Sequence, residues 1–228
     1  MLNLLNYFKS APPFSVWHSH PGQQTRVLIT AGVDGDEYAG IEAAKSLINN
    51  YHGTIPITII PVVNIPGYQT GASLNPLDGR YPKYIYPGSP LGSSSSKLRY
   101  KLSKYTKGID LWIDLHGGAT DEHLNPFIWA PEKYSVLSYL PGRSLVEDSI
   151  KKDVPYIILE SGELGQIKQS AINQHLNWVD SILNNLGKPT LPNWQPSFTK
   201  VKYEKFTGQK ADLNTLWYSE KEFVAATN

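Results

Sequence analysis

Apolar runs of strand length alternate in this chain with segments of helical periodicity, and this alternation constrains the fold more than any other feature. The runs that predict buried strands are residues 26–30, 57–63, 109–115 and 154–159. The segments that predict helices are residues 38–50, 97–105 and 171–186. This order predicts an α/β fold with a mixed, mostly parallel central sheet and helices on both faces.

One long segment, residues 64–96, shows little periodicity and is dense in Gly, Pro, Ser, Asn and Tyr. A loop of this length inside a compact domain is usually functional. The serines at 93–96 predict a helix start, with one serine as the N-cap. We expect residues 1–190 to form one α/β domain, and residues 191–228, which are aromatic and basic, to form a short C-terminal appendage.

Composition excludes several classes of partner and site. The 228 residues suffice for one well-buried core, and a net charge of +1 gives no field that would attract nucleic acid. The chain has no cysteine, so a metal would need His, Asp or Glu as ligands. No run approaches the roughly 20 apolar residues that span a bilayer, and residues 1–8 are too short and polar for a signal peptide. We therefore expect a cytoplasmic protein with no membrane partner.

Polar side chains stand at the ends of several predicted strands. Asp34 and Glu37 follow the first strand, His116 ends the third, and Glu160 ends the last. In open α/β sheets, ligands bind at the carboxyl ends of the strands, where such groups converge. These residue types bind metals or protons, so the sequence predicts one site built from Asp34, Glu37, His116 and Glu160.

Each of these residues also has a purely structural interpretation. Asp34 can be a turn residue or N-cap, and Glu37 can be an acid in the first turn of a helix, where the helix dipole favours it. His116 can be a hydrogen-bonded core histidine. The functional hypothesis gains its strength from the placement of all of them at one edge of the predicted sheet.

Several segments, taken in order, resemble motifs of the succinylglutamate desuccinylase/aspartoacylase family. The segment 29–40 resembles the first metal motif, a glycine-flanked His-x-x-Glu that follows a strand. The other segments that resemble family motifs are 64–68, 75–79, 86–88, 114–116 and 154–162. Each motif is moderately specific, whereas their ordered combination over residues 24–190 is much more so.

The resemblance implies a zinc-carboxypeptidase-like fold and hydrolysis of an amide bond in a small N-acyl amino acid or acylated amine. It implies one divalent metal ion, zinc, held by Asp34, Glu37 and His116. It gives Glu160, or alternatively Glu163, the role of the catalytic base. The implied partner is a small-molecule substrate. The sequence does not decide between a monomer and a homo-oligomer.

The chain departs from the family pattern where the family binds its metal and substrate. Asp34 stands in place of a histidine, and the arginine that follows the first Asn-Pro motif falls near Gln69. The family's Asn and Arg of a later motif have become Lys83 and Tyr84, and a lysine cannot grip a carboxylate with two parallel bonds as arginine does. The resemblance places substrate contacts at the positions of Asn64, Gln69, Lys83 and Tyr84. Lys83, Arg80 and Arg99 are the candidates to substitute for the lost arginines, so Arg80 is also expected among the substrate contacts.

The change at Asp34 has physical consequences. Two carboxylates and one neutral histidine cancel the double charge of a divalent ion, and a less positive ion acidifies bound water less. A site richer in oxygen also shifts the preference from zinc toward manganese or magnesium. The alternative hypothesis is therefore a non-catalytic relative that acts as a small-molecule binding or regulatory protein.

Overall fold

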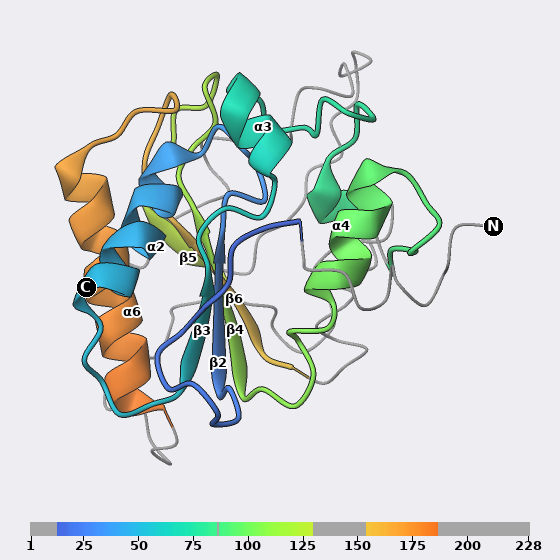
Figure 1. The fold of residues 1–228 in the computed structure, drawn as a ribbon. Helices are drawn as coiled ribbons and strands as arrows, with labels where there is room; N and C mark the ends of the chain where they lie inside the picture. The colour runs from blue at the N-terminus through green and yellow to red at the C-terminus, as the bar shows by residue number, and fades with distance from the viewer. Residues whose placement is uncertain (1–12, 86, 130–153, 187–228) are drawn as a thin grey trace, which may run out of the picture.

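The computed structural model describes residues 13–85, 87–129 and 154–186, which form a sheet covered by helices (Figure 1). The sheet has the strand order β1-β3-β2-β4-β6-β5. Its strands are β1 (Trp17–His18), β2 (Val27–Ala31), β3 (Ile57–Ile60), β4 (Leu111–His116), β5 (Phe127–Trp129) and β6 (Tyr156–Glu160). The expected domain boundary at residue 190 and the C-terminal appendage lie outside the described residues.

The four central strands β3, β2, β4 and β6 run parallel, and β1 and β5 pair antiparallel at the two edges. The prediction of a mixed, mostly parallel sheet is therefore confirmed. The edge strands escaped prediction because, with two and three residues, they are too short to show a period. β3 ends before Pro61, which has no N–H to donate to a ladder, so this strand is shorter than expected.

Helices lie on both faces of the sheet, as predicted. They are α2 (Tyr38–Asn50), α3 (Ile65–Thr70), α4 (Ser94–Leu102) and α6 (Gln169–Asn185), with a short 3₁₀ helix, η1 (Pro82–Tyr84). Helices α2 and α6 cover one face, and α4 packs on the other (Figure 1). None of the helices in the described ranges is both long and apolar enough to cross a bilayer.

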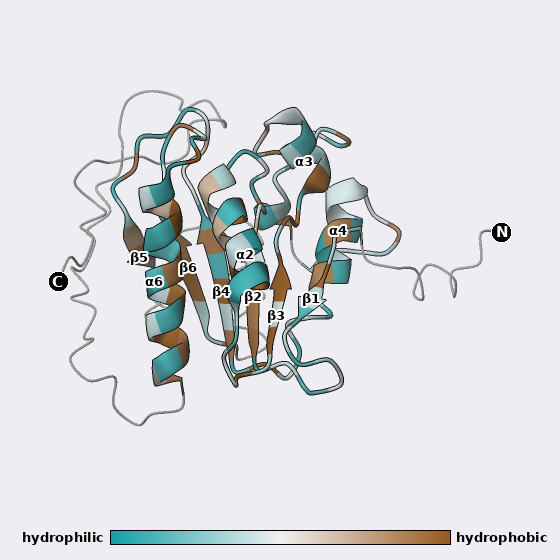
Figure 2. Cartoon of the chain, turned by 60° about the vertical axis from the view of Figure 1, so that its left-hand side comes forward, coloured by the Kyte–Doolittle hydropathy of each residue, from teal (hydrophilic) through white to brown (hydrophobic). Residues whose placement is uncertain are grey.

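The apolar side chains of the central strands divide between two cores. Because neighbouring residues of a strand point to opposite faces, Ile29 and Ile113 pack with α2 and α6, whereas Leu28 and Trp112 pack with α4. The central strands are accordingly mostly hydrophobic, with a polar stretch in β4, and the polar faces of the helices point outward (Figure 2). Burial on both faces explains why these strands appear in the sequence as continuous apolar runs.

The long segment 64–96 is more ordered than its composition indicated. Helix α3 begins after Asn64, whose side-chain oxygen accepts a hydrogen bond from Gly67 N, and ends at Gly71, which has a left-handed conformation. Helix α4 starts three residues earlier than predicted. Ser93 occupies its N-cap position, but Asp78 supplies the capping contacts, with Ser95 N and Oγ donating to its carboxylate at 2.7 and 2.8 Å.

Helix α2, whose predicted bounds match the structure, crosses the end of β4 at very short range. A Cβ atom at Gly40 would lie 2.6 Å from the carbonyl oxygen of Leu115. We expect Gly40→Ala to lower the free energy of unfolding by about 1–3 kcal/mol, although alanine favours a helix by about 1 kcal/mol over glycine. Denaturant unfolding measures the change.

Asn49→Ala, at an exposed position of the same helix, is the matched control and should change stability by less than about 0.5 kcal/mol. Equal stability of Gly40→Ala and the wild type would contradict the close packing of α2 on β4.

Candidate metal centre

The loop that follows β2 carries Asp34 and Glu37 and is held tightly in place. A Cβ at Gly35 would lie 2.3 Å from the backbone of Gly67 in α3, so only glycine permits this approach. Asp36 accepts hydrogen bonds from Ser73 Oγ at 2.7 Å and from the backbone N and Oγ of Thr120, each at 3.1 Å. Asp36 therefore fastens the loop, whereas Asp34 and Glu37 on the same loop face the site.

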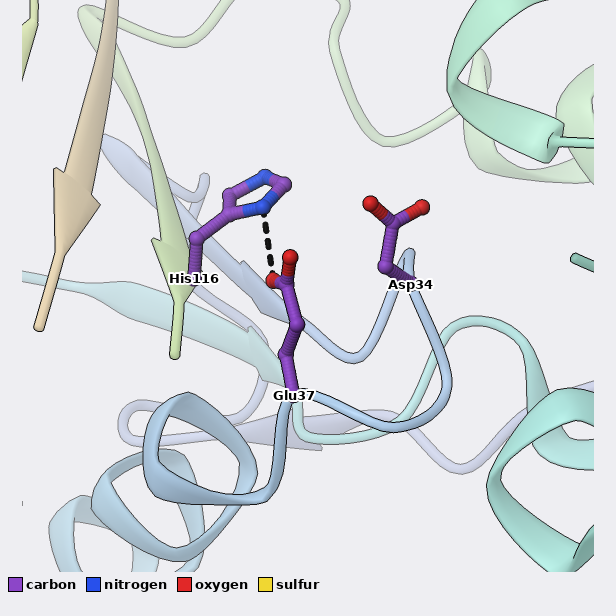
Figure 3. A group of neighbouring side chains, drawn as sticks. All are labelled: Asp34, Glu37 and His116. Carbon is purple, nitrogen blue, oxygen red and sulfur yellow. Dashed lines mark ion pairs between the residues drawn. The ribbon is translucent and has the colours of Figure 1, made fainter. Parts of the chain in front are cut away.

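Asp34, Glu37 and His116 converge at the carboxyl edge of the sheet (Figure 3). One potential ligand atom from each lies within 4.8 Å of the other two, and all three residues are buried. Glu37 Oε2 is 2.7 Å from His116 Nδ1, and it also accepts a hydrogen bond from Gly117 N at 3.3 Å. The arrangement offers two carboxylates and one imidazole to a single point.

His116 is oriented by a buried carboxylate on its own strand. Asp114 lies two residues earlier on the same face of β4, and its Oδ2 is 3.3 Å from His116 Nε2. The hydroxyls of Thr30 and Tyr156 donate to Asp114 at 2.6 and 2.8 Å. With Nε2 directed at Asp114, Nδ1 faces Glu37, which is the carboxylate–histidine arrangement that commonly orients metal-binding imidazoles.

Glu160 borders the same cluster from β6. Its register partner across the sheet is His116, and Glu160 Oε2 lies 3.9 Å from His116 Nδ1. Its other oxygen accepts a hydrogen bond from Gly118 N at 2.9 Å. Glu163, the competing candidate for the base, instead pairs with Lys168 and His123 at 2.5 and 3.0 Å, outside this cluster.

Burial dominates the electrostatics of the cluster. It raises the pKa of Glu37 to about 7, against the opposing effect of His116. Burial and the charge of Glu37 raise the pKa of Glu160 to about 8. Burial alone would lower the pKa of His116, but Glu37 and Asp114 outweigh it and raise this pKa well above 6.5. The positive charge of His116 is therefore too small to compensate for the carboxylates of Glu37 and Glu160. A bound cation would supply the missing positive charge.

Lys83 reaches this cluster from η1 and forms an ion pair with Asp34 through Oδ2. The ammonium also lies over the rings of Tyr84 and Tyr81, 5.3 and 5.7 Å from their centroids. The other carboxylate oxygen, Asp34 Oδ1, is buried and has no hydrogen-bond partner among the described residues. An unpartnered buried oxygen on one residue of the Asp34, Glu37 and His116 cluster fits a cation that accepts oxygen and nitrogen ligands.

The other expected substrate contacts are placed differently. Asn64 is buried and uses its side chain to cap α3 and to donate to Ser73 O at 3.1 Å. Gln69 and Arg80 are exposed, whereas Tyr84 stands beside Lys83 with 40% of its surface exposed. Arg99 is a buried residue of α4, and its Nε donates to Ile85 O at 3.0 Å. Lys83 pairs with Asp34, and Tyr84 lies beneath the ammonium of Lys83, so these two residues adjoin the metal cluster.

Two features of the site have no counterpart in the sequence predictions: the contact of Asp114 with His116 and the ion pair of Lys83 with Asp34. A signal for Asp114 was present, because residues two apart on a strand share a face and Asp114 precedes His116 by two. No local signal links positions 34 and 83, since their contact depends on the path of the segment that contains α3 and η1.

The mostly parallel sheet, covered by helices on both faces and with an Asp/Glu/His cluster at its carboxyl edge, defines a zinc-carboxypeptidase-like α/β fold. The sequence model of the succinylglutamate desuccinylase/aspartoacylase catalytic domain matches residues 23–140, just over half of the 228 residues. The chain therefore belongs to the succinylglutamate desuccinylase/aspartoacylase family.

Individual relatives agree with this family. The chain is 30% identical over 110 residues to the N-alpha-acetyl-L-2,4-diaminobutyric acid deacetylase of Halomonas elongata, which covers 46% of this chain and 32% of the relative. The succinylglutamate desuccinylase/aspartoacylase structure from Rhodobacter sphaeroides superposes with a TM-score of 0.67 at 22% identity, covering 76% of this chain and 59% of the other. The product-bound ectoine utilization protein EutE (DoeB) from Ruegeria pomeroyi superposes with a TM-score of 0.68 at 19% identity, covering 75% of this chain and 60% of the other.

These matches also show how much of the relatives this chain represents. It spans about a third of the deacetylase and about three fifths of the two solved structures. At 22% and 19% identity, the structural matches establish the fold that the two share with this chain.

The raised pKa values predict how stability depends on pH. Between pH 4.5 and about 8 the unfolded chain releases protons that the folded Glu37 and Glu160 retain, so the metal-free protein loses stability as pH rises. His116 acts in the same direction, because the stability from its raised pKa is lost as pH rises through that pKa. A loss of about 2 kcal/mol would lower the Tm by about 4–8 °C.

Thermal unfolding of chelator-treated protein, from about pH 6 to about pH 8, measures this slope. Added zinc or manganese should flatten it, because a bound cation favours the ionised carboxylates. The double variant Glu37→Gln/Glu160→Gln should lose most of the slope. A Tm that rises with pH in the metal-free wild type would contradict the assignment.

Proposed function

We propose that this protein is a metal-dependent hydrolase that cleaves an amide bond in a small N-acyl amino acid or acylated amine. The observation that carries the proposal is the convergence of Asp34, Glu37 and His116 within 4.8 Å, with Glu160 beside them. Family membership and the deacetylase relative support the same class of reaction. Zinc is the first choice of ion, and manganese and magnesium are the alternatives favoured by two carboxylate ligands.

Asp34, Glu37 and His116 would hold the ion. When bound, a divalent ion supplies Lewis-acid chemistry, which lowers the pKa of a water molecule and polarises a carbonyl group. Asp114 orients the ring of His116 so that Nδ1 lies toward Glu37, where it would be available to a bound ion. Gly117 N and Gly118 N hold the carboxylates of Glu37 and Glu160 on either side of the imidazole.

Glu160 is the proposed general base. It would take a proton from the attacking water and pass it to the nitrogen of the scissile amide, so that the amine leaves neutral. Its pKa of about 8 in the metal-free protein places it near the range in which a carboxylate can both accept and return a proton. Glu163 is a weaker candidate because Lys168 and His123 hold it elsewhere.

The substrate is small, and its recognition differs from the arginine-based pattern of the family. Lys83 and Tyr84 are the candidate contacts that adjoin the metal cluster. A lysine offers one point charge, so a carboxylate of the substrate would be attracted without the two-bond geometry that arginine imposes. We propose a cytoplasmic protein with a small-molecule substrate as partner.

A second candidate function is small-molecule binding without turnover. The ion pair between Lys83 and Asp34 favours it, because an ammonium group already neutralises one of the proposed ligands.

The metal content of the purified protein separates the two candidate functions. Protein purified without chelator should contain about one equivalent of zinc or manganese if it is a hydrolase. Less than about a tenth of an equivalent, with no uptake of added metal, would reject the hydrolase.

The role of Glu160 is tested by Glu160→Gln. We expect this change to remove hydrolysis of N-acetylated amino acids by at least about 10²-fold while the metal content stays unchanged, because the amide cannot accept the proton. Release of the free amine measures the rate, and elemental analysis measures the metal. Glu163→Gln is the matched control and should retain activity; the opposite outcome would give the role of base to Glu163.

A further inference from the structure

We propose that Asp34 and Lys83 act as one neutral unit of the metal centre, in which Asp34 supplies the ligand oxygen and Lys83 is a positioning residue that holds and neutralises it. The inference rests on the proposed metal site and explains how an aspartate can serve there. It also gives Lys83, one of the departures from the family pattern, a role toward another departure, Asp34, beside its candidacy as a substrate contact.

The two oxygens of Asp34 have different surroundings. Oδ2 is bound by Lys83, whereas Oδ1 is buried without a hydrogen-bond partner in the described part of the chain. The side chain of Asp34 is 1% exposed and that of Lys83 is 16% exposed, so neither charge is well solvated. Lys83 therefore fixes the rotation of the Asp34 carboxylate and leaves Oδ1 as the oxygen available to bind a metal ion.

Lys83 is itself held in position. Its ammonium lies over the rings of Tyr84 and Tyr81, and Pro82, which is buried, precedes it in η1. Aromatic faces stabilise a cation that has lost part of its water. A lysine that is enclosed in this way acts as a fixed charge beside the cluster.

Charge explains what the pair achieves. Asp34 and Glu37 alone would cancel the double charge of a divalent ion, and the ion would then acidify water poorly. The ammonium of Lys83 adds one positive charge, so the centre as a whole regains the net positive charge that two histidines and one glutamate would leave. The Asp34–Lys83 pair is thus the electrostatic equivalent of one neutral ligand.

The pair is tested first in the metal-free protein by a double-mutant cycle. Lys83→Met leaves a buried carboxylate unpaired, and Asp34→Asn leaves a buried ammonium unpaired, so each single variant should have a lower Tm than the wild type. The double variant Asp34→Asn/Lys83→Met has neither charge and should recover most of the loss. If the Tm losses of the two single variants simply add in the double variant, the proposed pairing of Asp34 and Lys83 is overturned. A single variant that does not fold, beside a double variant that does, would support it.

The effect on the metal is tested by zinc affinity, measured by competition with a chromophoric chelator. Lys83→Met should bind zinc at least tenfold more tightly than the wild type, because a positive charge next to the ion is removed. A lysine with a merely structural role predicts unchanged or weaker binding, and either result would overturn the proposal. Lys83→Arg keeps the charge and should stay close to the wild-type affinity.

Lys45→Met is the matched control. Lys45 also forms an ion pair, with Glu42 at 2.7 Å, and lies over a tyrosine ring, 5.1 Å from the centroid of Tyr68. Its loss should leave zinc affinity unchanged. Absence of zinc binding in the wild type and in every variant would reject the metal site of the proposed function, whereas equal zinc binding by all of them would reject only the role of Lys83.

Discussion

The parallel pairing of β2, β4 and β6 is the constraint on which the site depends. It brings the ends of three strands, far apart in the sequence, to one edge, and its register sets His116 directly opposite Glu160. The loop after β2 then adds Asp34 and Glu37 to the same edge, where Gly35 and Asp36 fasten it to α3 and to Thr120. A shift of β4 by one residue would turn both Asp114 and His116 to the opposite face.

This geometry concentrates negative charge in a buried place. Asp34, Glu37, Asp114 and Glu160 are all buried within one neighbourhood, and burial of carboxylates is costly unless positive charge or hydrogen bonds compensate for it. Asp114 is compensated by two hydroxyl donors and His116, and Asp34 by Lys83. Glu37 and Glu160 have less compensation, and burial raises the pKa of both carboxyl groups. A cation at the point where Asp34, Glu37 and His116 converge would compensate for this negative charge.

Much of this fold could be predicted from the sequence because the central strands are buried on both faces. Such strands appear as largely apolar runs, and His116 and Glu160 are visible as the polar residues at which two of the runs stop. Glu37 follows a third run after a short loop. The short edge strands carry too few residues for a period. Helix α3 had its signals, an Asn before an Ile-Pro pair and a closing glycine, but the surrounding glycines, prolines and serines obscured them.

The contact of Lys83 with Asp34 could not be predicted in this way, because it joins a strand-end loop to a residue of η1 through tertiary packing. It changes the meaning of the aspartate at position 34. In the proposed metal centre, Asp34 alone would add a negative charge, whereas Asp34 paired with Lys83 would add none. What matters to a metal centre is the charge of the whole surrounding shell, and ligand residues can therefore change when a second residue changes with them. A motif that has lost a histidine is accordingly insufficient evidence that the chemistry of the site is lost.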